Sequence, residues 1–247
     1  MALYDRDYMH RPLPRGGFAS VHMWSVTTWL IVINVAVFLI DQMTPQWRVT
    51  AGGHRSIMGT LEAWGFFSVT AAMFRLQLWR FLSFQFLHAS LGHLFGNMLA
   101  LYLFGQIVES YFGRKRFLGF YLICGLGGAL GYMLLWTLRI PLIYSADMPL
   151  IGASAGVFGV LIAAAWLAPN VQIMLLFPPV SLRLKTLAWF MMLVAAYTVY
   201  THGRNAGGEA AHIGGGLLGL GFMTIEHYLH PLSRPHPPYE DPTDQDN

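Results

Sequence analysis

Six apolar stretches constrain this fold most, because a chain that carries them cannot leave them in water. They span about residues 24–42, 91–112, 117–138, 154–168, 186–201 and 209–229. Their lengths suit helices in a hydrocarbon layer about 30 Å thick, and they do not follow the pattern of barrel strands. Only 11% of the 247 residues are charged, whereas soluble domains carry about 25%. The sequence predicts an all-α membrane protein, a bundle of six transmembrane helices.

The segments around these stretches predict how the chain is divided. Residues 43–87 are polar and interrupted by glycine, and their tryptophan and phenylalanine side chains suit the depth of lipid headgroups. They predict a long first loop that folds at the membrane interface. We expect three parts: a cytosolic N-terminal segment at 1–23, a six-span core at 24–229 and a Pro-rich, acidic, disordered tail at 230–247.

The distribution of lysine and arginine predicts the orientation and the partners. With the N-terminus inside, inner segments hold nine basic residues and outer segments six, four of these in the long first loop. The positive-inside rule then favours a cytoplasmic N-terminus. The net charge of +3 is modest and the basic residues flank the spans, so we expect a lipid bilayer and no nucleic acid as partner. A single cysteine, Cys124, excludes an internal disulfide and a cysteine-based zinc site.

Polar side chains begin three predicted spans that run in the same direction. His93 and Asn97 start the second span, Ser154 the fourth and His212 the sixth, so all four lie in the outer leaflet. The fourth span holds about 14 residues, roughly 21 Å of helix, which is short of a bilayer core. We therefore expect a short, recessed fourth helix, entered through an irregular segment near Gly152 that protein or water must cover.

A buried serine and histidine together suggest acyl transfer, since a serine beside a base can act as a nucleophile. Ser154 alone would be an ordinary helix cap, and His212 could simply bond a backbone carbonyl. Gly215 and Gly219 favour a pairing, because they lie on the face of His212 and let two membrane helices approach closely. The fourth span offers a matching stripe of small residues: Ala155, Gly159 and Ala163.

His93 and Asn97 lie one turn apart on one helix face, and both can donate hydrogen bonds to an oxyanion beside the Ser154 backbone N–H. They could instead bond each other or a loop carbonyl. Phe158 follows Ser154 by one turn, so it either packs on the His212 ring or belongs to the apolar core.

Other hydrolytic chemistries fit this chain poorly. It has no His-Glu-x-x-His motif, and Asp41 and Asp147 are placed where they cannot pair, so we expect no metal and no cofactor. Glu209 precedes His212 by one turn and could orient it or face water, which favours a Ser154–His212 dyad over a triad. A channel would need polar groups through the inner leaflet, yet the second and fourth spans turn apolar there, which predicts a cavity closed at its bottom.

Four motifs, in order over about residues 24–229, resemble those of the rhomboid family of intramembrane serine proteases. They are Trp79-Arg80, His88-x4-His93-x3-Asn97, Gly152-Ala153-Ser154 and Ala211-His212-x2-Gly215-x3-Gly219. Each motif alone would be weak evidence, but four in register are specific. The resemblance implies the minimal six-span, bacterial-type form in an inner membrane.

The resemblance also implies roles for individual residues. Ser154 would be the nucleophile and His212 the base and later the acid. His93, Asn97 and the Ser154 backbone would form the oxyanion site, and Phe158 would pack beside the catalytic pair. Substrates would be single-span membrane proteins, cut within or next to their transmembrane segment.

One position departs from the family pattern. Ala155 stands where glycine commonly follows the serine, and its methyl group could narrow the approach of a substrate. Because the family also has inactive members, a protein that binds membrane clients without cutting them is the alternative.

Overall fold

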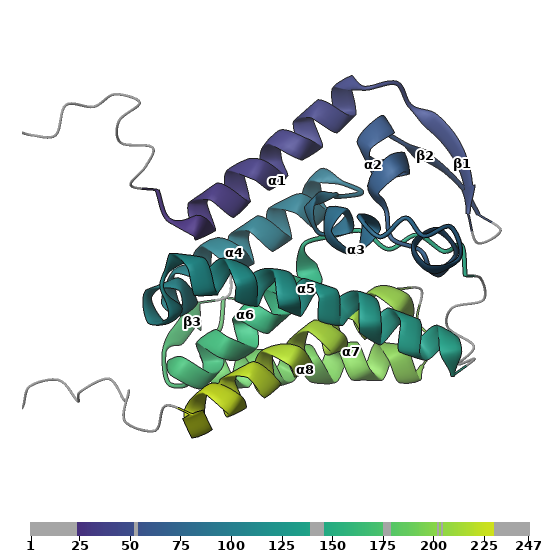
Figure 1. The fold of residues 1–247 in the computed structure, drawn as a ribbon. Helices are drawn as coiled ribbons and strands as arrows, with labels where there is room; N and C mark the ends of the chain where they lie inside the picture. Colours follow the sequence, from purple (N-terminus) through teal and green to yellow (C-terminus); the bar gives the residue numbers. More distant parts are fainter. Residues whose placement is uncertain are drawn as a thin grey trace, which may run out of the picture.

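The computed structural model describes residues 24–51, 54–138, 146–174, 179–201, 203 and 205–229. Within these residues, six helices of 14 to 24 residues pack into one bundle (Figure 1). They are α1 (Val26–Met43), α4 (Leu91–Phe112), α5 (Arg114–Thr137), α6 (Ser154–Leu167), α7 (Leu184–Tyr200) and α8 (Ala206–Leu229). The predicted segments 1–23 and 230–247 lie outside the described residues.

The surface of the bundle is that of a membrane protein. α1, α4 and α5 are each long and apolar enough to cross a bilayer, and α6 and α7 are shorter apolar helices. Large apolar side chains are exposed along the helices, which a water-facing surface of this extent would not tolerate. Examples are Ile33, Leu39, Phe95, Tyr102, Leu130, Leu134, Trp189, Phe190, Leu193 and Leu217.

Two small hairpins correct the expectation of a purely helical fold. β1 (Trp47–Ala51) pairs antiparallel with β2 (His54–Met58), and β3 (Gln172–Met174) with β4 (Ser181–Arg183), where they join α6 to α7. β1, β2 and β3 hold β-branched or aromatic residues, which favour strands, but each of the four strands is too short for a clear alternating pattern. β1 and β3 mark opposite ends of the bundle, and α1 begins and α8 ends near the β3 end (Figure 1).

The loop between α1 and α4 is folded throughout its later part. After the first hairpin come α2 (Thr60–Gly65), a π-helical turn η3 (Thr70–Phe74), α3 (Arg80–Ser83) and a 3-10 turn η4 (Phe84–Phe86). The buried Arg80 guanidinium holds them together: it donates to the Phe66 carbonyl at 2.5 Å and to Gln77 Oε1 at 2.6 Å. The Trp79-Arg80 motif therefore serves the architecture of this loop.

Two carboxylates from α1 and α4 cap helices elsewhere in the chain. Asp41 Oδ1 accepts the N–H groups of Leu61 and Glu62 in α2, at 2.7 and 3.3 Å. Glu109 accepts the first two N–H groups of α1 at 2.7 and 2.9 Å. Since the first N–H groups of a helix have no intrahelical partner, these carboxylates stabilise the helix starts and join the loop and α1 to the bundle.

α6 is the central helix of the bundle. It packs against α4, α5, α7 and α8, and its residues from Ala155 to Leu161 are all buried. Apolar residues on every side suit a helix with neighbours all round. The 14 residues of α6 agree with the short fourth helix expected from the sequence.

The first prediction concerns Glu62, whose pKa is raised to about 7, first by burial and then by the charge of Asp41. An acid with a raised pKa holds its proton more tightly in the folded than in the unfolded chain, so the folded state loses stability as pH rises from 4.5 to about 7. After solvent screening we expect a loss of about 1 kcal/mol. Thermal unfolding at pH 5 and pH 8 should show a smaller difference for Glu62→Gln than for wild type. An equal difference in both proteins would contradict this assignment.

Candidate active site

An irregular segment, residues 146–153, leads into α6 and is held by the loop between α1 and α4. Leu150 and Phe67 exchange two backbone hydrogen bonds, of 2.7 and 3.0 Å, and the Gly152 N–H donates to the Phe84 carbonyl at 2.9 Å. Gly152 has a φ of +132°, which L side chains rarely adopt. Backbone groups without helical hydrogen bonds are thus satisfied inside the protein, which is the condition that the expected recessed helix start requires.

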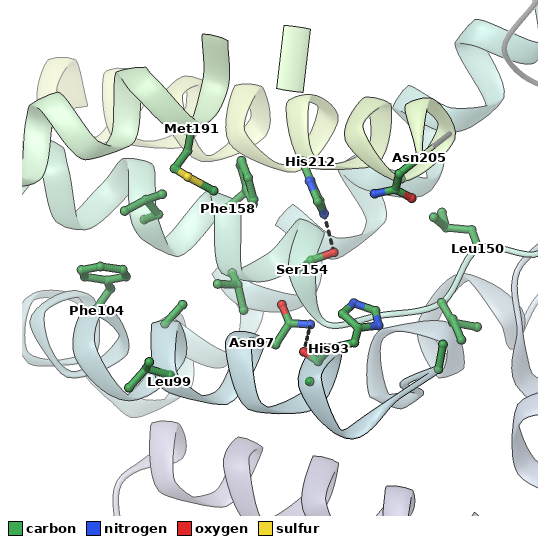
Figure 2. Close-up of a pocket in the computed structure, with 18 of the residues that line it drawn as sticks. His93, Asn97, Leu99, Phe104, Leu150, Ser154, Phe158, Met191, Asn205 and His212 are labelled. Carbon is green, nitrogen blue, oxygen red and sulfur yellow. Dashed lines mark hydrogen bonds between the residues drawn. The ribbon is translucent and has the colours of Figure 1, made fainter. Parts of the chain in front are cut away.

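Ser154 and His212 form a hydrogen bond across the interface of α6 and α8. The distance from His212 Nε2 to Ser154 Oγ is 2.7 Å (Figure 2). Ser154 is the first residue of α6, and the cap position belongs to Ala153, whose side chain makes no capping bond. The Ser154 hydroxyl is therefore directed at the imidazole and does not cap the helix, so the reading of Ser154 as a plain cap does not apply.

Glycines let α6 and α8 approach closely enough for this bond. A Cβ on Gly215 would collide with the carbonyl of Ala155, and one on Gly219 would lie 2.8 Å from Gly159 Cα. These are the small residues that the sequence pattern paired. The side chain of Ala155 points at Gly128 of α5 and is almost fully buried, so its methyl group lies away from the cavity and does not narrow it.

Two further side chains hold the His212 ring. Phe158 stacks on it, with ring centres 4.3 Å apart and planes 10° from parallel. Glu209 Oε2 lies 2.8 Å from His212 Nδ1. Sequence reasoning left open whether Glu209 faces water; in the structure it faces the histidine. The spacing of three residues between Glu209 and His212 was the only feature of the sequence that could have predicted this contact. Spacing alone does not give the direction of a side chain.

His93 and Asn97 approach Ser154 from α4, opposite His212 (Figure 2). A Cβ on Gly152 would lie 2.9 Å from His93 Nε2 and 3.5 Å from Ser154 Oγ, so both side chains border the same glycine. Asn97 Nδ2 donates one hydrogen to the His93 carbonyl at 3.1 Å. An amide nitrogen carries two hydrogens, so the second can serve an anion near Ser154.

His88 supports His93 from behind. The two rings lie 5.0 Å apart at 64°, and His88 is buried at the junction of the loop with α4. Burial, and then the neighbouring His93, lowers the pKa of His88 to about 3. His88 is thus an uncharged packing residue at neutral pH.

A cavity of about 1000 Å³ joins these groups. Its polar lining includes His93, Asn97, Ser154, Asn205 and His212, and it continues as an apolar groove between α4 and α7 toward β3. The groove is lined by Phe104, Leu161, Ile173, Met174, Leu187 and Met191. The sequence predicted a cavity closed at its bottom, and the structure adds that the cavity extends well past the polar residues, where α4 and α7 pack little against each other.

The groove carries apolar side chains where a water-filled channel would need polar ones. Among the described residues, no cluster of histidine, cysteine, aspartate or glutamate could hold a metal ion. The arrangement places a serine hydroxyl, an imidazole and further hydrogen-bonding side chains at the polar end of an apolar groove.

Comparisons with known proteins agree with the sequence motifs. Residues 75–229, more than half of the chain, match the rhomboid domain. The chain is 26% identical over 226 residues to "Rhomboid protein 1, mitochondrial" of Saccharomyces cerevisiae, covering 88% of this chain and 58% of that protein. It is 27% identical over 169 residues to "RHOMBOID-like protein 1" of Arabidopsis thaliana, covering 68% and 41%. It is 26% identical over 227 residues to "Rhomboid protease AarA" of Providencia stuartii, covering 83% and 75%.

The glycine contact between α6 and α8 yields the second prediction. Gly215→Ala should force the helices apart, because the new methyl group would meet the Ala155 carbonyl. We expect a loss of about 1–3 kcal/mol in unfolding free energy and loss of Ser154 reactivity toward a fluorophosphonate, which needs the base within reach.

Gly221→Ala is the matched control on the same helix. A Cβ there meets no heavy atom within 4 Å among the described residues, so stability and reactivity should remain near wild type. Equal behaviour of the two variants would show that the α6–α8 contact does not depend on glycine.

Proposed function

The chain belongs to the rhomboid family, and on this basis we propose that it is an intramembrane serine endopeptidase that cleaves single-span membrane proteins. The observation that carries the proposal is the 2.7 Å hydrogen bond between Ser154 Oγ and His212 Nε2. A serine is a weak nucleophile until a base takes its proton. Here the base lies at hydrogen-bond distance, inside a cavity that a polypeptide can enter from the side.

In the proposed reaction, Ser154 Oγ attacks the carbonyl carbon of the scissile peptide bond and His212 Nε2 takes the hydroxyl proton. The imidazolium then gives this proton to the leaving amine, and an acyl-enzyme remains on Ser154. Water enters from the polar end of the cavity, loses a proton to His212 and attacks the ester. The second tetrahedral intermediate collapses, and the proton returns to Ser154 Oγ.

The oxyanion of each tetrahedral intermediate would lie between α4 and the start of α6. The N–H groups of the first turn of α6 have no helical partner, and the positive end of the helix favours negative charge there. The His93 ring and the second hydrogen of the Asn97 amide lie on the opposite wall. Donors fixed before the reaction stabilise the transition state more than the substrate, which is how such a site accelerates acyl transfer.

The apolar groove supports a transmembrane helix as substrate. It opens between α4 and α7 and ends at the polar residues, so an apolar helix could lie along it and present a locally unwound stretch to Ser154.

We propose that all six helices of the bundle cross the bilayer, with the β3 end in the cytoplasm. The basic residues near that end support this orientation: Arg114, Lys115, Arg116, Arg183 and Lys185.

The third prediction tests the nucleophile and the base. Ser154→Ala and His212→Ala should each abolish cleavage, by purified protein in lipid, of a tagged single-span substrate with Gly or Pro in its helix. Cleavage that survives Ser154→Ala would overturn the assignment of the nucleophile. A wild-type protein that binds the substrate without cutting it would instead be a client-binding member of the family.

The fourth prediction concerns the oxyanion donors. His93→Ala should lower kcat by about 10²–10³ with little change in KM, because the donor acts mainly in the transition state. His227 lies in the last turn of α8, at the other end of that helix from His212. His227→Ala is therefore the control and should leave kcat unchanged. An equal loss in both variants would argue against the oxyanion role of His93.

A further inference from the structure

We propose that Glu209 is a positioning residue for His212, which makes the site a Ser154–His212–Glu209 triad. This inference rests on the proposed function and adds to it a residue that acts through the histidine. The family resemblance implies no role for Glu209, so its assignment comes from the geometry of this chain.

The two ring nitrogens of His212 have different partners. Nδ1 lies 2.8 Å from Glu209 Oε2, and Nε2 lies 2.7 Å from Ser154 Oγ. A carboxylate can only accept a hydrogen bond, so it holds the imidazole hydrogen on Nδ1. Nε2 is then left as an acceptor for the Ser154 hydroxyl, which is the tautomer a general base needs.

Glu209 is itself held in place. Asn205, the residue before α8, donates from Nδ2 to Glu209 Oε1 at 3.3 Å. A Cβ on Gly208 would lie 2.5 Å from Asn205 Oδ1, so the glycine leaves room for the asparagine beside the glutamate. With Phe158 stacked on its face, the ring of His212 is fixed by contacts at Nδ1, at Nε2 and on one side.

Partial burial strengthens the interaction between the Glu209 carboxylate and the charge that forms on His212 during catalysis. The Glu209 and His212 side chains are only 19% and 15% exposed, so their interaction is screened less than that of a surface pair. When His212 takes the proton of Ser154, the positive charge forms beside the carboxylate. Glu209 stabilises this charge while keeping its own charge, and no proton passes to it.

A plainer reason for an acidic residue here is the helix dipole, which favours a carboxylate in the first turn of any helix. That role stabilises α8 but does not depend on His212. The two roles differ in what they do to the pH dependence of the reaction, because only a contact with the base changes how readily that base binds a proton.

The experiment measures the pH profile of substrate cleavage for Glu209→Gln, Glu209→Asp and wild type in lipid. We expect Glu209→Gln to lower kcat by about 10²-fold, less than the roughly 10⁴-fold known for a fully buried triad carboxylate, with KM little changed. Because the carboxylate favours the protonated base, its removal should move the acidic limb of the profile to lower pH. Glu209→Asp keeps the charge, so it should recover part of the rate and keep the acidic limb near that of wild type.

Glu226→Gln is the matched control, since it removes a carboxylate from the same helix near its other end, where Glu226 pairs with Arg116. It should leave kcat and the position of the acidic limb unchanged. A Glu209→Gln enzyme with wild-type kcat and an unmoved acidic limb would overturn the inference. So would a fall in kcat in which Glu209→Asp behaves like Glu209→Gln and the limb does not move, because that pattern indicates a structural role.

The proposed function is tested by a different comparison, that of wild type with Ser154→Ala. If wild type cleaves and Ser154→Ala does not, the proposed function stands, whatever Glu209→Gln does. If wild type neither cleaves nor reacts with a fluorophosphonate, the proposed function fails, and the triad fails with it.

Discussion

The contact between α6 and α8 is the interaction on which the rest of this structure depends. Gly215 lies against the Ala155 carbonyl and Gly219 against Gly159, so the two helices approach almost backbone to backbone. In a bilayer, helices gain little by hiding apolar surface from lipid, and association relies on close packing of small residues. The same contact places His212 within 2.7 Å of Ser154. Packing and chemistry therefore rest on the same few glycines, and a side chain there would affect both.

The irregular segment before Ser154 is stabilised by the rest of the fold. Backbone groups of residues 146–153 form hydrogen bonds with Phe67, Thr70 and Phe84 in the loop between α1 and α4. That loop is in turn held by the Arg80 guanidinium and by the Asp41 carboxylate at the end of α1. Its internal polar contacts make it a scaffold for the segment that leads to Ser154.

The cavity combines the two environments that the proposed reaction needs at once. Its polar end gathers serine, histidine and amide groups, and its apolar part runs between α4 and α7, which make little contact with each other. A peptide bond in a stable helix is shielded by its own hydrogen bonds, so a reacting segment must unwind where polar groups can replace them. The boundary between groove and polar pocket offers such a place.

The sequence by itself determined the long apolar helices, the short α6 and four of the polar residues at the polar end of the cavity, because helical periodicity and span direction assign residues to faces and sides. Those four are His93, Asn97, Ser154 and His212, whereas the place of Asn205 in the lining came only from the structure. The sequence also paired the small residues of α6 and α8. Three features could not be predicted from the sequence. The two hairpins have strands too short for a pattern, and the extent of the groove depends on how far α4 stands from α7. The third is the direction of the Glu209 side chain. One turn of helix brings Glu209 near His212, but only the packing of Asn205 and Phe158 around that turn decides that the carboxylate meets Nδ1. Side-chain direction is set by neighbours that lie far apart in the sequence, so only the tertiary structure could decide it.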